Sequence, residues 1–138
     1  MSGFAEVSDI LWRERELLDL LLFKLDSEQL LLRAGRVQWL ARSTHEIDLV
    51  LEQLQLVEIT RALEVDDLAV QLGLQPGATL SDLAAAAPTP WAALFQAHRA
   101  AFRTLIEEVT DLAEANQRAL REACATSEQK LAPLRVPV

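Results

Sequence analysis

The chain has 138 residues, a formal net charge of −8 at pH 7, and an apolar content of 51% with only 5% aromatic residues. Its apolar residues are mostly Leu and Ala, which favours helices, because a β protein of this size would use more Val, Ile, Thr and Tyr. The 13 Lys and Arg residues are scattered along an acidic chain, so the composition argues against nucleic-acid binding and membrane association, which need a concentrated positive patch.

The first predicted helix runs from Ile10 to about Leu32. Ser8 or Asp9 can cap it, because either side chain can accept a hydrogen bond from the free amides of a helix start. Gly35 follows, and a glycine at this point can adopt the left-handed conformation that ends many helices. The helix is apolar on more than one face, so we expect it to lie between two neighbours or to offer a surface to a partner.

A second helical region is predicted from Arg36 to Leu72. Ser43 and Thr44 interrupt its apolar pattern and leave two alternatives, namely one bent helix or a short helix followed by a long one. Four of its apolar residues are seven positions apart, which is the repeat of a helix packed along another helix. These are Leu49, Leu56, Leu63 and Val70.

The clearest loop is GLQPGAT at residues 73–79, because Gly73 can end a helix and the Pro-Gly pair favours a turn. Residues 79–82 (Thr-Leu-Ser-Asp) then resemble a capping box, in which the first and last side chains bond reciprocally to each other's backbone amides. A short helix is expected as far as Ala87, and the Pro-Thr-Pro sequence at residues 88–90 separates it from the next helix.

The last predicted helix runs from Trp91 to about Ala123 and contains neither Gly nor Pro. Asn116 lies at an a-type position of its heptads and is either buried, where it can fix the register, or at an exposed edge. Residues 126–138 lose the helical period and contain two prolines, so we expect a mobile tail there. Three lines of residues at heptad spacing run along this helix. The first consists of Phe95, Phe102, Val109, Asn116 and Ala123, and the second of His98, Leu105, Leu112 and Ala119. The third widens the apolar stripe and consists of Ile106, Ala113 and Leu120.

These elements predict an all-α fold, an elongated antiparallel bundle of three long helices plus a short connecting helix. We expect residues 1–125 to form a single domain.

The sequence shows no constellation of catalytic or metal-ligating residues. A dinuclear site in a helical bundle needs Glu-x-x-His pairs, but Arg42 and Phe95 stand three residues before His45 and His98. Cys124 is the only cysteine, so an internal disulfide is excluded. We therefore expect no catalytic residue, cofactor or metal, and a protein that is not an enzyme. The sequence has neither a signal-peptide pattern nor an apolar run long enough to span a bilayer, so we expect a soluble, cytoplasmic protein.

Four segments occur in an informative order along residues 8–123. They are ILWRERELLDLLLFKLDSEQLLLRAG, WLARSTHEIDLVLEQLQLVEITRA, the short helix TLSDLAAAAP, and the closing LIEEVTDLAEANQRALREA with its Asn-Gln-Arg sequence. In composition, and above all in order, these segments resemble the FlgN-type flagellar export chaperones.

The resemblance implies a cytoplasmic, non-enzymatic chaperone of the flagellar type III export system. Such chaperones bind the C-terminal helical segments of hook-filament junction (hook-associated) proteins, keep them soluble and deliver them to the export gate. The export apparatus is then a second partner. Independently of the resemblance, the large apolar surface on so few elements favours a homo-oligomer in the absence of client. The family binds its client through the C-terminal helical region, which places the client-binding residues here at Phe102, Leu105, Ile106, Val109, Leu112, Asn116 and Leu120.

One departure and one alternative stand beside this interpretation. Some family members dock on the export gate through a tyrosine near the C-terminus, and this chain has no Tyr. The alternative function is a non-enzymatic helical adaptor or a coiled-coil oligomerisation protein, which heptads in several segments permit.

Overall fold

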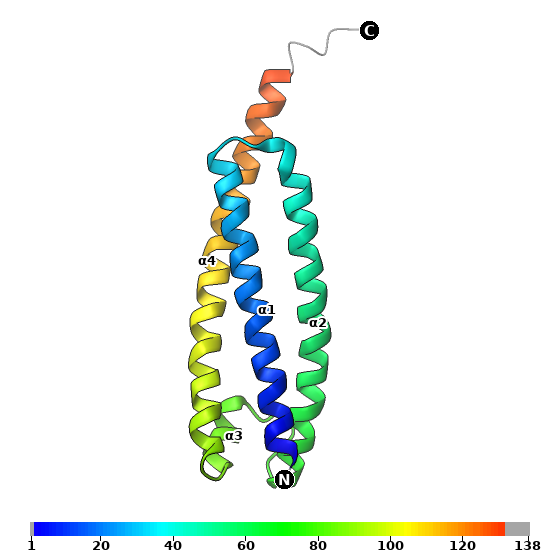
Figure 1. The fold of residues 1–138 in the computed structure, drawn as a ribbon, viewed down its shortest axis with the longest axis vertical. Coiled ribbons are helices and arrows are strands. Elements are labelled where there is room, and N and C mark those ends of the chain that lie inside the picture. The colour runs from blue at the N-terminus through cyan, green and yellow to red at the C-terminus, as the bar shows by residue number, and fades with distance from the viewer. Residues whose placement is uncertain (1, 132–138) are drawn as a thin grey trace.

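The structure, a computed structural model, describes residues 2–131, with side chains described for residues 3–123. It contains three long helices in an up-down-up order and one short helix between the second and the third (Figure 1). The elements are α1 (Ser2–Arg33), a 3-10 turn η1 (Val37–Trp39), α2 (Leu40–Gln71), α3 (Leu80–Ala86) and α4 (Trp91–Leu131). The predicted all-α, elongated bundle of three long helices and a short one is therefore confirmed.

The central element of the fold is α1, which packs against both α2 and α4, while α3 packs against α4. In Figure 1, α2 and α4 flank α1 on opposite sides, and α1 and α4 run in the same direction. The core therefore forms along the two faces of α1, as expected of a helix that is apolar on more than one face.

The first helix begins at Ser2, eight residues earlier than the predicted start at Ile10. The added turns bury Phe4 and Val7, and the Phe4 ring stacks on Trp91 with a centroid distance of 5.8 Å. Ser8 lies within the helix and is buried, so the prediction that Ser8 or Asp9 caps α1 is wrong. This apolar contact over a large sequence separation outweighs the local capping preference of Ser8.

Two glycines with left-handed backbones end α1 and α2. Gly35 has φ 68° and Gly73 has φ 70°, a region in which a residue with a Cβ is strained. Between them α2 is continuous from Leu40 to Gln71 and passes through Ser43 without a break. The interruption expected at Ser43 and Thr44 is therefore absent, and the region consists of the 3-10 turn η1 followed directly by one long helix.

The predicted capping box at the start of α3 is confirmed. Thr79 Oγ1 accepts from the Asp82 amide at 3.1 Å, and Asp82 Oδ2 accepts from the Thr79 amide at 2.9 Å. These hydrogen bonds hold the pKa of the Asp82 carboxyl below its usual range. The cap fixes the start of a seven-residue helix that buries Leu83 and Ala84.

The last helix continues to Leu131, eight residues beyond its predicted end at Ala123. Residues 126–131 of the predicted tail are thus helical, and residues 132–138 lie outside the described residues. Figure 1 shows this end of α4 projecting past the turn between α1 and α2. Within residues 2–131, no helix is long and apolar enough to cross a membrane.

Candidate functional site

The proposed client-binding residues of α4 lie mainly on the side of the helix that faces α1. Phe102 and Asn116 are buried, with exposed fractions of 9% and 1%, whereas Ile106 is 52% exposed. The other four are half-buried, and all but the last of them pack against the core: Leu105, Val109, Leu112 and Leu120. The heptad stripe of α4 is therefore largely occupied by α1, and Ile106 is the member that solvent reaches most freely.

A groove runs between α2 and α4 and has a volume of about 570 Å³. Its floor is formed by Glu14 and Leu18 of α1, and Phe102 and Ile106 of α4 contribute apolar side chains. The remaining residues that line it are Glu58, Arg61, Leu80, Arg99, Arg103 and Glu107. This α2–α4 groove combines an apolar centre with charged side chains of both signs, which suits the side of an amphipathic helix.

Glu14 is the buried charged residue on the floor of the α2–α4 groove. Its Oε1 forms an ion pair with Arg61 Nη1 at 3.4 Å, and among the described residues its Oε2 has no hydrogen-bond partner. Burial raises the pKa of the Glu14 carboxyl, an effect that the charge of Arg61 opposes and that of Glu58 adds to. This contact links α1 to α2 below the groove.

A second groove lies on the other side of α4, with a volume of about 590 Å³. Trp12 and Arg15 of α1 and Leu105 of α4 are among its lining residues, so we refer to it as the Trp12 groove. The Arg15 guanidinium lies 4.0 Å from the centroid of the Trp12 ring, a cation–π contact that orients both side chains. Together the two grooves expose both margins of the α1–α4 contact.

A buried histidine lies in the α1–α4 contact beside the Trp12 groove. Arg15 Nη1 lies 3.1 Å from His98 Nδ1, and Ser8 Oγ lies 3.1 Å from His98 Nε2. Because a guanidinium can only donate, Nδ1 is the acceptor, and the Nε2–H group of a neutral ring donates to Ser8. Burial and the charge of Arg15 lower the pKa of His98. His98 therefore joins the two helices as a neutral side chain.

A second polar contact joins α1 and α4 nearer the other end. Asn116 Nδ2 donates to the Leu25 carbonyl oxygen at 2.8 Å and to Glu28 Oε1 at 3.1 Å. Burial raises the pKa of Glu28, and the hydrogen bond from Asn116 partly opposes this effect. Of the two alternatives for Asn116, the buried position is the correct one, and its contacts fix the register of α4 on α1.

Sequence reasoning proposed client-binding residues on α4 alone and missed the residues of α1 that line the same grooves. Glu14 and Leu18 line the α2–α4 groove, and Trp12 lines the Trp12 groove. Each of these α1 residues is more than 80 positions away in sequence from the α4 residues that line the same groove. The usable signal was Trp12, an aromatic residue among the charged residues of α1, since an exposed Trp is common at binding surfaces.

A comparison with known protein families establishes the family of this chain. A protein-family model described as FlgN protein matches residues 1–137, nearly the whole chain. The chain belongs to the FlgN family. It is a flagellar export chaperone for hook-associated proteins and not an enzyme. No curated protein and no solved structure matches the chain.

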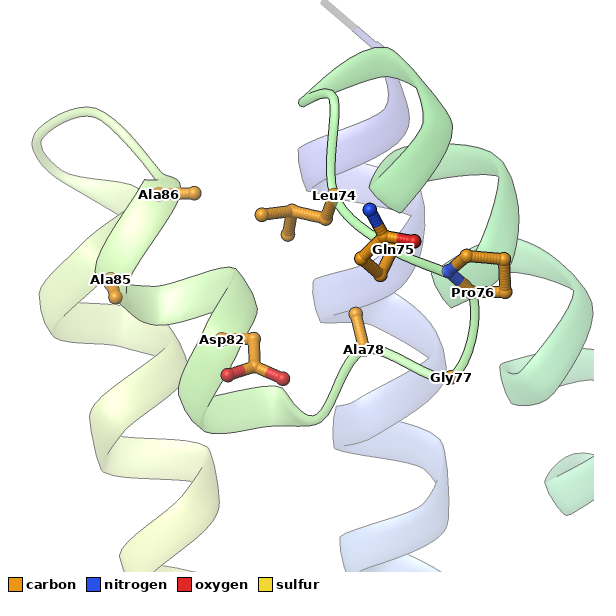
Figure 2. A pocket seen from close by; sticks show the side chains of 8 residues that line it. All are labelled: Leu74, Gln75, Pro76, Gly77, Ala78, Asp82, Ala85 and Ala86. Carbon is orange, nitrogen blue, oxygen red and sulfur yellow. The ribbon is translucent and has the colours of Figure 1, made fainter.

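A third hollow at the α3 end of the bundle is lined mostly by small and apolar residues. It has a volume of about 460 Å³ and lies between α3 and the loop that precedes it (Figure 2). Asp82 is the only charged residue that lines it, and its carboxylate is engaged in the capping box. Within residues 3–123, no group of three or more His, Cys, Asp and Glu residues could hold a metal ion.

Proposed function

We propose that this FlgN chain binds the C-terminal helical segments of hook-associated proteins along α4, in the α2–α4 groove. It keeps these segments soluble in the cytoplasm and delivers them to the export gate. The observation that carries the proposal is the position of Ile106, which is 52% exposed and lies beside Phe102 at the apolar centre of a groove lined by residues of all four helices.

A client helix in this groove would contact α1 below it and α2 and α4 on either side. Leu18, Leu80, Phe102 and Ile106 offer it an apolar strip, and burial of such side chains is the main source of affinity in a helix-in-groove contact. Charged residues line the same groove, among them Arg103 on α4 and Glu58 on α2. They can pair with charges on the client and set its orientation.

The seven proposed residues would then act in different ways. Ile106 contacts the client directly, and Phe102 forms the apolar wall behind it. Asn116 is buried and acts as a positioning residue, because it holds α4 on α1. The partly exposed side chains extend the contact along α4 and onto the side of the Trp12 groove: Leu105, Val109, Leu112 and Leu120.

Two further partners belong to this proposal. Delivery requires a contact with the export apparatus, and because the chain has no Tyr, that contact uses residues other than the tyrosine of some relatives. Without client, the apolar grooves beside α4 favour weak self-association, since exposed apolar surface of this kind promotes contact between copies.

The test is binding of the full chain to hook-associated proteins from the same genome, with and without their C-terminal segments. We expect a stoichiometric complex that is lost when the client is truncated. Ile106→Asp should weaken it by at least about tenfold, because the carboxylate would be buried against apolar side chains. The matched control is Leu30→Asp, since Leu30 is an exposed leucine of α1 that does not line the groove.

Two results would contradict the proposal. Absence of a complex with every hook-associated protein would refute the assignment of the clients. Equal weakening by Ile106→Asp and Leu30→Asp would leave the clients in place but show that the α2–α4 groove is not their binding site.

A further inference from the structure

The outward face of α2 carries an apolar stripe that no other described element covers. Figure 1 shows α2 at one edge of the molecule, with α1 on its inner side. The residues of α2 that pack inward include Ile47, Val50, Leu54 and Leu68. The outer stripe consists of five exposed residues, with exposed fractions in parentheses: Leu49 (43%), Leu56 (67%), Ile59 (61%), Leu63 (63%) and Val70 (77%).

The spacing of the outer stripe is that of a helix–helix contact. Four of its members are seven residues apart and Ile59 follows Leu56 by three, so all five share one face of α2. Leu49 and Val70, the ends of the stripe, are 21 positions apart, which corresponds to about 32 Å of helix. An exposed heptad stripe of this length is the kind of surface that marks a binding site.

The charges around the outer stripe are acidic. Glu52 and Asp66 lie three residues after Leu49 and Leu63 and are exposed on the same face. Asp48 and Asp67 are exposed at its margins. The only Lys or Arg between residues 43 and 72 is Arg61, whose guanidinium forms an ion pair with Glu14 of α1 and is therefore directed inward.

These charges disfavour a second copy of the chain as the occupant. A parallel pair of stripes would place Glu52 opposite Glu52 of the other copy, and like charges in such a line repel. An antiparallel pair would place Glu52 and Asp66 against leucines, which would bury both carboxylates without partners. A helix with Lys or Arg at the facing positions would pair with them instead.

We propose that the outer stripe of α2 is a docking site for an amphipathic helix of another protein, with an apolar stripe flanked by Lys and Arg. The occupant needs about 20 residues to match the length of the stripe. The surface is separate from the α2–α4 groove, because residues of the stripe do not line that groove. A client helix and a basic helix can therefore be bound at the same time.

The test uses the full chain and a synthetic 21-residue helical peptide with Leu at heptad positions and Lys at the flanking positions. One control peptide has Glu in place of Lys, and a second has the same composition in scrambled order. Titration calorimetry at low salt should show saturable binding of the Lys peptide, with both control peptides at least about tenfold weaker.

Variants of the chain then locate the site. Leu56→Ser with Leu63→Ser should weaken the Lys peptide by at least about tenfold, because the two most central leucines of the stripe lose their apolar contact. Leu30→Ser, which alters an exposed leucine of α1, should leave binding unchanged. Glu52→Gln with Asp66→Asn should weaken binding several-fold and reduce its salt dependence. Both positions are exposed, so these polar substitutions should leave the fold intact.

Three results would overturn the proposal. Equal binding of the scrambled peptide would mean simple attraction to an acidic protein. If both double variants bind the Lys peptide as tightly as the wild-type chain does, the binding site lies elsewhere. A dimer of the wild-type chain that dissociates on Leu56→Ser with Leu63→Ser, measured by sedimentation, would assign the stripe to a second copy.

Discussion

Removal of the Asn116 amide provides a direct test of the register contact between α1 and α4. In Asn116→Ala, Glu28 loses the donor at 3.1 Å and the Leu25 carbonyl loses the donor at 2.8 Å. A hydrogen bond to a charged group contributes about 1.5–3 kcal/mol and a neutral one about 0.5–1.5 kcal/mol. We therefore expect the free energy of unfolding to fall by about 2–4 kcal/mol.

Most of this loss of stability should depend on Glu28, which accepts one of the two hydrogen bonds of Asn116. In a Glu28→Ala background the buried carboxylate is absent, so Asn116→Ala removes only the bond to Leu25 and should lower the free energy of unfolding by about 0.5–1.5 kcal/mol. The difference between the two backgrounds is the coupling energy of the pair. It should be well above the few tenths of a kcal/mol by which independent sites deviate from additivity.

The assay is urea unfolding at pH 7, followed by circular dichroism, for the four chains of this double-mutant cycle. If Asn116→Ala lowers the free energy of unfolding equally in both backgrounds, the reasoning is refuted, because the hydrogen bond from the Asn116 amide to Glu28 would then not stabilise the fold. No loss in either background would show that neither bond stabilises the α1–α4 contact.

Two further predictions concern pH and capping. Because the pKa of His98 is lowered in the fold, the unfolded chain takes up this proton first as the pH falls below about 6.5. The wild-type chain should therefore lose stability relative to His98→Asn below that pH and not above it, as measured by urea unfolding at pH 7.5 and 5.5. Thr79→Ala should lower the free energy of unfolding by about 1 kcal/mol through loss of the cap of α3, and Thr79→Ser should restore most of it; no difference between the two variants would contradict this.

How far the sequence predicts the fold depends on the range of the interaction that decides each feature. The capping box at Thr79 and the left-handed Gly35 involve neighbours within a few residues, and both were predictable. The true start of α1 was not, because Phe4 is buried by Trp91 and Ser8 bonds to His98, both far away in sequence. A local capping rule has no access to such contacts.

The candidate site shows the same limit in a different form. Heptad spacing in the sequence is equally regular in α2 and α4, yet the line containing Phe102 packs on α1 whereas the line containing Leu56 faces solvent. Periodicity establishes that a helix has an apolar stripe, and it leaves open which helix covers that stripe. For this reason the apolar stripe of α4 was predictable, while the α1 residues that cover it and the exposure of the α2 stripe required the structure.

The two polar contacts of the α1–α4 interface bear directly on the proposed groove. His98 and Asn116 are 18 residues apart, about 27 Å along α4, and Ile106 lies between them. A slip of α4 by one heptad would bring Arg99 or Ala113 to the place of Ile106, and either replacement would remove apolar area from the centre of the groove. Buried polar contacts that pair only in one register oppose such a slip, even where they add little to stability. A chain with apolar residues in place of both contacts should therefore remain folded but bind its client more weakly, since its stripe would accept more than one alignment on α1.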